Sequence, residues 1–108
     1  MNLLGSSILL IDCHSNAFVA VGNELRYKKE KIHNEQVSAV AVAPSGEMFA
    51  SGSRDKSVKV WSKTLVLLHI IDVHKAKVNA VLFFDHSLMV FDLDAVISVH
   101  QIDSSSKI

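Results

Sequence analysis

The stretch HNEQVSAVAVAPSGEMFASGSRDKSVKVW, residues 33–61, decides the fold of this chain. Apolar and polar residues alternate along it, as in Val58 and Val60 on either side of Lys59, and a period of two is typical of a half-buried β-strand. The Pro-Ser-Gly at 44–46 predicts a turn, because proline presets φ and glycine supplies a positive φ. The stretch therefore predicts short antiparallel strands joined by tight turns.

The same pattern recurs about 40 residues further on, as HKAKVNAVLFFDHSLMVFDLDAVISVH at 74–100. His33 and His74 lie 41 residues apart, and Trp61 and His100 lie 39 apart. A weaker third copy lies upstream, where residues 9–21 align without gaps on the end of the first stretch. Fixed periods of this length indicate propellers or solenoids, because one repeat cannot bury its apolar face alone.

Alternation and turn residues, read over the whole chain, predict an all-β protein without helices. The ten expected strands are 7–12, 17–21, 25–32, 37–43, 48–53, 57–61, 65–71, 78–84, 88–91 and 96–100.

The charge balance of the chain excludes several classes of function. Lys plus Arg and Asp plus Glu each number 11 among 108 residues, which argues against the basic face that nucleic acids or anionic membranes favour. No apolar block approaches the roughly 18 residues that span a bilayer.

The single cysteine, Cys13, cannot form an internal disulfide, which fits a reducing compartment. We expect a cytoplasmic protein, with the nucleus as the alternative.

Two groups of residues in the sequence are of types that can form chemical sites. Asp12-Cys13-His14 suggests a thiolate pair, but neighbours in a strand point to opposite faces, so a hydrolase using Cys13 and His14 is a remote alternative. The six histidines lack the Cys-x-x-Cys or His-x-x-x-His spacing of a zinc site. The sequence thus favours a non-enzymatic protein that needs neither metal nor cofactor.

The stretch 33–61 resembles a WD-repeat β-propeller unit: His, three residues, Val, an apolar strand, P-S-G, a strand ending S-G-S, then Asp and V-K-V-W. The resemblance implies a partial WD-repeat β-propeller of four-stranded antiparallel blades. In this family each repeat supplies an outer strand d and then strands a, b and c.

The resemblance also implies how the chain divides. Residues 1–32 would form a partial blade (strands b, c and the following d), 33–73 a complete repeat, 74–102 a degenerate repeat, and 103–108 a polar tail. About two and a half blades would result.

A buried hydrogen-bond tetrad comes with the family. It maps fully once, onto His33, Ser51, Asp55 and Trp61, and its expected role is structural. In the following copy His74 and Asp94 are kept as structural residues, while Val90 replaces the serine and His100 the tryptophan.

Partners in this family usually dock on the face that bears the d–a and b–c loops. The resemblance places six candidates there: Arg54, Gln36 and Ser38, with Lys77, Asn79 and Leu93 as their counterparts. We therefore expect a protein-protein interaction scaffold. The alternative is a structural subunit or truncated isoform whose open blade flanks are buried in a multi-protein complex.

An incomplete propeller would leave two apolar flanks without neighbours, and such surfaces associate with something. Three interpretations stay open: a fragment or short isoform of a larger propeller, a short protein that completes a ring with other chains or copies of itself, and a small β-sandwich-like remnant.

Overall fold

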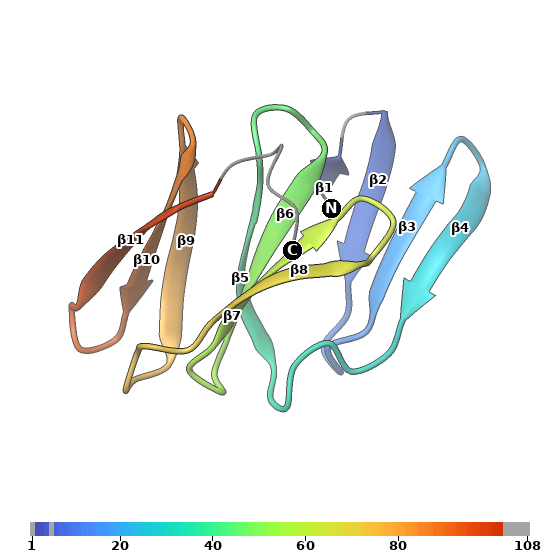
Figure 1. Cartoon of the computed structure of the whole chain (residues 1–108). Helices are drawn as coiled ribbons and strands as arrows, with labels where there is room; N and C mark the ends of the chain where they lie inside the picture. The colour runs from blue at the N-terminus through green and yellow to red at the C-terminus, as the bar shows by residue number, and fades with distance from the viewer. Residues whose placement is uncertain (1, 5, 103–108) are drawn as a thin grey trace.

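Eleven strands in three antiparallel sheets make up the described part of the chain, which comprises residues 2–4 and 6–102 of the computed structural model (Figure 1). The sheets stand side by side, and we call them blades one, two and three in chain order. The all-β prediction is confirmed. No helix in this part is long and apolar enough to cross a membrane.

Blade one has one strand more than the sequence predicted. Its strands lie in the order β1 (Asn2–Leu4), β2 (Ser7–Ile11), β3 (Ala17–Val21), β4 (Glu24–Lys29). The extra strand is β1, which pairs antiparallel with β2. Three residues are too few to show an alternation, so periodicity could not reveal it. The expected partial blade is therefore a four-stranded sheet.

Blade two contains the stretch at 33–61 that decided the fold. Its order is β5 (Val37–Val42), β6 (Met48–Ser53), β7 (Val58–Ser62), β8 (Leu67–Ile71). The turn between β5 and β6 contains Gly46 at φ 74°, in the region that favours glycine.

Blade three has three strands in the described residues, in the order β9 (Val78–Phe84), β10 (Ser87–Asp92), β11 (Ile97–Gln101). The pairings of β9 with β10 and of β10 with β11 correspond to those of β5 with β6 and of β6 with β7. Thus Val90 pairs with Ser98 as Ser51 pairs with Lys59.

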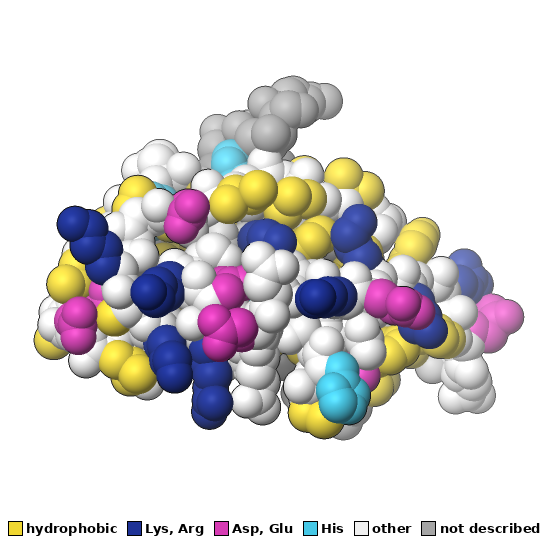
Figure 2. Space-filling view, turned by 90° about the horizontal axis from the view of Figure 1, so that it is seen from below, with side chains coloured by type: hydrophobic (Ala, Val, Ile, Leu, Met, Phe, Trp, Pro, Cys, Tyr) yellow, Lys and Arg dark blue, Asp and Glu magenta, His cyan; other side chains and the backbone are white. Residues whose placement is uncertain are grey.

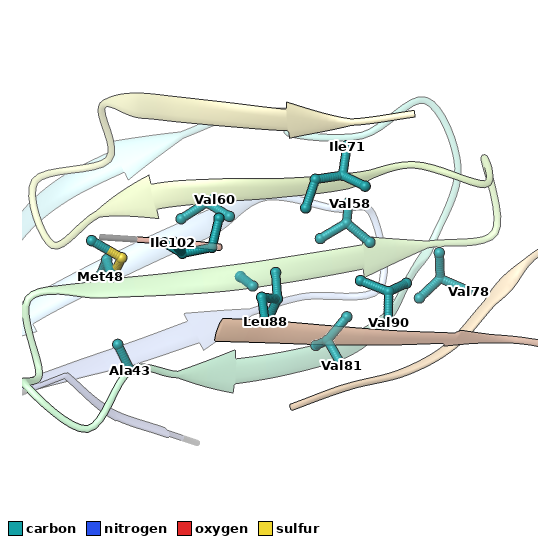
Figure 3. Close-up of a cluster of buried hydrophobic side chains, with 11 residues drawn as sticks. Ala43, Met48, Val58, Val60, Ile71, Val78, Val81, Leu88, Val90 and Ile102 are labelled. Atoms are coloured by element: carbon teal, nitrogen blue, oxygen red, sulfur yellow. The ribbon is translucent and has the colours of Figure 1, made fainter. Parts of the chain in front are cut away.

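The core consists of two apolar clusters, one in each space between blades. Successive residues of a strand point to opposite faces, and all six residues of β6 are buried because blade two is covered on both sides. Figure 3 shows the cluster between blades two and three. Between blades one and two lie Leu9, Ala17, Val19, Ile32, Phe49, Trp61 and Leu65.

Glycine at position 52 lets blade three approach blade two closely. A Cβ on Gly52 would lie 2.5 Å from Cγ1 of Val78, at the start of β9. At the same point Ser38 Oγ donates a 2.6 Å hydrogen bond to the carbonyl of Val78. The first strands of the two blades are thereby held together at their lower ends (Figure 1).

The face of blade three that points away from blade two has no cover among the described residues. It exposes large apolar side chains that belong to β9 and β11, namely Leu82, Phe84, Ile97 and Val99, each more than half exposed. Hydrophobic side chains are accordingly visible at the left end of the molecule in Figure 2.

Candidate functional site: histidine networks and the loop face

A buried chain of hydrogen bonds links four side chains of blade two. Trp61 Nε1 donates to Ser51 Oγ over 3.0 Å, and Ser51 Oγ lies 2.7 Å from His33 Nε2. His33 Nδ1 lies 3.1 Å from Asp55 Oδ2. Because an indole N–H can only donate, the bonds run in one direction, from Trp61 through Ser51 and His33 to Asp55.

Asp55 is the end of this chain and also closes the turn between β6 and β7. Its Oδ1 accepts from the N–H and the hydroxyl of Ser57, at 2.9 and 2.6 Å, and its Oδ2 accepts from the N–H of Asn34 at 3.0 Å. Burial raises the pKa of the Asp55 carboxyl, but the bonds from Ser57 and Asn34 outweigh it and the pKa lies below its usual value. Burial also lowers the pKa of His33, against the opposing effect of Asp55.

Blade three contains a second chain of the same kind, but the aspartate in it is Asp92. His74 Nδ1 lies 2.7 Å from Asp92 Oδ2, His74 Nε2 lies 2.6 Å from Ser98 Oγ, and His100 Nε2 lies 2.8 Å from Ser98 Oγ. The expectation that Asp94 is the structural aspartate is wrong, because Asp94 is exposed. The His74 ring is buried, and its structural role stays a prediction.

The turn between β10 and β11 explains why Asp92, and not Asp94, accepts the hydrogen bond from His74. Ser53 and Asp92 each donate their N–H to the carbonyl four residues on, over 3.1 Å, so they occupy equivalent positions. Ser53 Oγ accepts from the N–H two residues on. Asp92 does the same with Oδ1, which accepts from Asp94 and Val96, and its second oxygen is left for His74.

Two pKa values in the second chain are lowered. The hydrogen bond from His74 lowers the pKa of the Asp92 carboxyl, helped by the main-chain bonds from Val96 and Asp94. Burial lowers the pKa of His100, and the nearby His74 acts in the same direction.

Ser98 was missed by the sequence alignment, which placed Val90 opposite Ser51 and treated the network as broken. The serine comes instead from β11, directly across from Val90. A signal was present, because Ser98 and His100 are two residues apart on a strand and therefore face the same side.

The lower ends of the blades in Figure 1 form what we call the loop face. It consists of the turns between second and third strands and the segments that lead into the first strand of blades two and three: 12–16, 30–36, 54–57, 72–77 and 93–96. Figure 2 looks onto this face, where Lys and Arg side chains lie across the width of the molecule with Asp and Glu side chains among them.

Four of the predicted partner-binding residues lie on the loop face at equivalent positions in the two repeats. The N–H of Arg54 donates to the carbonyl of Gln36 over 3.1 Å, and the N–H of Leu93 donates to the carbonyl of Lys77 over 3.0 Å. All four side chains are exposed. The main chain is thus fixed while the side chains remain accessible.

The other two predicted residues, Ser38 and Asn79, lie on the first strands of blades two and three. Asn79 is exposed. Ser38 is exposed as a residue, but its hydroxyl already bonds to blade three. Ser38 therefore joins the two blades, and its hydroxyl is less available to a partner than the side chain of Arg54.

Residues 27–62 match the family model described as "WD domain, G-beta repeat". This stretch is a WD40 repeat, so the resemblance to WD-repeat proteins is confirmed for it. WD40 repeats generally mediate protein-protein interaction, and the family is typically non-enzymatic.

Two curated proteins are similar to parts of the chain. Over 45 residues it is 47% identical to "Probable inactive serine/threonine-protein kinase lvsG" of Dictyostelium discoideum, covering 42% of this chain and 2% of that protein. Over 63 residues it is 35% identical to "Nuclear distribution protein nudF 1" of Talaromyces marneffei, covering 55% of this chain and 14% of that protein. The chain thus spans a small part of these relatives.

Solved structures show the same fold at low sequence identity. The WD40 repeats of RRP9 superpose with a TM-score of 0.83 at 20% identity, over 95% of this chain and 34% of that chain. The computationally designed Ika4 protein superposes with a TM-score of 0.78 at 22% identity, over 91% of this chain and 61% of that chain. The described chain is thus a partial WD-repeat propeller.

The network of Asp55, His33 and Ser51 has the order of groups found in serine hydrolases, but its serine is not accessible. Ser51 is completely buried, and its hydroxyl is held on one side by His33 and on the other by Trp61. A substrate could not reach this oxygen without separating blades one and two. The network instead anchors the segment that enters the first strand to the turn between the second and third.

Sequence reasoning also missed a hollow on the loop face between blades one and two. Two adjoining cavities of about 390 and 350 Å³ lie there, and both are lined by Cys13 and Gln36. His14 and Asn34 line the larger one. The hollow offers a partner a recess beside Gln36.

Proposed function

We propose that this chain is a non-enzymatic interaction scaffold that docks other proteins on the loop face. One observation carries the proposal: Arg54 and its counterparts are exposed on loops whose main chain is fixed. A rigid loop loses little conformational freedom when a partner binds, so more of the contact energy appears as affinity. The WD40 repeat at residues 27–62 supports this, since such repeats generally mediate protein-protein interaction.

Arg54 is the residue on which we expect the partner to depend most. The ion pairs found among residues 6–102 do not include it. Arginine is enriched at interaction hot spots and presents a planar fork to carboxylate or phosphate. Its neighbour Asp55 holds the turn, so the Arg54 side chain is presented from a fixed point.

The experiment is capture of partners from a lysate by the native chain and by Arg54→Ala, read by mass spectrometry. The matched control is Arg26→Ala, because Arg26 is also exposed but lies on the outer strand β4 beside Glu24. We expect Arg54→Ala to weaken capture, at a cost of about 2 kcal/mol or more at a hot spot, and to change stability by less than about 0.5 kcal/mol. Unaltered capture, or equal loss with the control, would remove Arg54 from the interface.

The proposal includes a cytoplasmic location, with the nucleus as the alternative. It is supported by the free, exposed Cys13, which a reducing compartment tolerates. Imaging of a fluorescent fusion tests it, and accumulation in the secretory pathway would contradict it.

A second candidate is a structural subunit whose open flanks are buried in an assembly. The exposed outer face of blade three favours it, because contiguous apolar surface of this kind marks an interface. In that case partner capture would depend on the flank and not on Arg54.

A further inference from the structure

We propose that the uncovered face of blade three binds blade one of a second copy of this chain, so that two chains close into one ring. The proposal rests on the second candidate function, the structural subunit, and names a second copy of the chain as the protein that covers the open flank. It does not involve Arg54, so partner capture and self-association can fail independently.

The uncovered face of blade three is a continuous apolar surface across three strands. Leu82, Met89 and Val99 lie in one row of paired residues, and Phe91 and Ile97 lie in the next. Leu82, Ile97 and Val99 are each more than half exposed.

This surface is the repeat equivalent of an interface that the chain already contains. Val60 of blade two pairs with Ala50 at the register position where Val99 of blade three pairs with Met89. Val60 is completely buried in the cluster that blade three closes (Figure 3). The natural cover for Val99 is therefore another blade, presented as blade three is presented to blade two.

Blade three covers blade two with residues at defined positions, among them Val90, which is paired with Ser98. Blade one is shifted by one residue from the sequence alignment, because the N–H of Asp12 bonds to the carbonyl of Asn16 as that of Ser53 bonds to Ser57. The position of Val90 is therefore held in blade one by Leu10, paired with Phe18. Leu10 is 46% exposed, so among the described residues nothing fully covers the required face at the opposite side of the molecule. It has Phe18 where blade three has Ser98, and Lys28 Nζ lies 6.0 Å from the centroid of the Phe18 ring. The long Lys28 side chain must therefore extend its charged end to the rim when the two faces meet.

The two faces belong to different blades at opposite sides of the chain, which makes the contact between them head-to-tail (Figure 1). A head-to-tail contact either closes into a ring or continues as a filament. Two copies bring six blades, which lies within the range of about four to eight for closed propellers. Closure buries both uncovered faces of both chains at once.

The test uses the native 108-residue chain and measures its mass by light scattering across the micromolar range. We expect a single species of twice the 11.9 kDa mass of the chain. Val99→Lys and Leu10→Lys should each give monomers. The matched control is Val66→Lys, which replaces an equally exposed valine in the turn before β8 and should leave the mass unchanged.

A mixture supplies the decisive arm. Val99→Lys and Leu10→Glu should each be monomeric alone but form a two-chain species when mixed, because one interface then pairs Lys with Glu and the other is native. A monomeric native chain would overturn the proposal in favour of a cover from other protein. Masses that grow with concentration would overturn ring closure, and a mixture that stays monomeric would overturn the pairing of Leu10 with Val99. Circular dichroism of each variant checks that it folds.

Discussion

Replacing Ser51 by alanine tests whether the network of blade two holds the fold together. The change removes the oxygen that joins Trp61 to His33, both of which are at most 2% exposed. A buried polar group without a partner costs about 1–3 kcal/mol. Because the site is buried, no water can replace the serine oxygen as acceptor for the N–H of Trp61. His33 Nε2 then has only the main-chain carbonyl of residue 51 nearby, at 3.1 Å, and an unprotonated nitrogen cannot donate to a carbonyl. We therefore expect a loss of about 2–4 kcal/mol for the two stranded groups.

Ser98→Ala is the informative comparison, because it removes the equivalent oxygen from blade three. His100 is only partly buried, so water can accept its N–H and one stranded group remains. We expect a loss of about 1–2 kcal/mol. Ser45→Ala, in an exposed turn, serves as the control and should change stability by less than about 0.5 kcal/mol.

Urea unfolding followed by Trp61 fluorescence and by circular dichroism measures these differences. The two signals should coincide, and for a domain of this size the loss in Ser51→Ala corresponds to a fall in Tm of roughly 10–20 °C. Equal losses in the two blades, or a larger loss in Ser98→Ala, would refute the reasoning from burial.

Three further outcomes are expected. Asp92→Ala should lower the Tm clearly and Asp94→Ala hardly at all, since the first carboxylate is buried against a histidine and the second is exposed; the reverse order in thermal melts would restore the alignment that the structure corrects. Gly52→Ala should cost about 1–3 kcal/mol by overpacking, and less in a Val78→Ala background that removes the clashing atom; a double-mutant cycle without coupling would contradict this contact. Finally, burial lowers the pKa of His33 below its ordinary value of 6.5, so the folded state resists a proton that the unfolded chain accepts, and stability should fall as pH drops below about 6.5. Melts that are flat between neutral pH and pH 5 would contradict this prediction.

Most strands could be read from the sequence because alternation and turn residues agree. The misses have local causes. The strand expected at 65–71 begins at Leu67, because Leu65 adopts φ 64° in a turn closed by its N–H to Ser62. An apolar residue in such a turn gives no sequence signal, since positive φ is read from glycine or asparagine. The strand expected at 25–32 ends at Lys29, and Ile32 leaves the sheet to fill the core between blades.

The first network could be placed from the sequence because its four residue types stand at family spacings. Which aspartate serves the second network could not. Asp92 and Asp94 belong to the same turn, and the choice depends on which carboxylate reaches His74 when the turn closes. That is a matter of three-dimensional geometry, for which a spacing of 39 or 41 residues is too coarse.

The second network keeps the direction of the first with different residues. His100 donates where Trp61 donates, Ser98 passes the bond on from the neighbouring strand, and Asp92 accepts at the end. An imidazole that donates from Nδ1 to the Asp92 carboxylate accepts at Nε2, so Ser98 donates to His74 and accepts from His100 Nε2. A repeat that lacks the family's serine and tryptophan positions therefore still ties its entering segment to its turn. The turn of blade three therefore holds the carbonyl of Lys77, as the turn of blade two holds the carbonyl of Gln36. Both repeats can thus present side chains on the loop face.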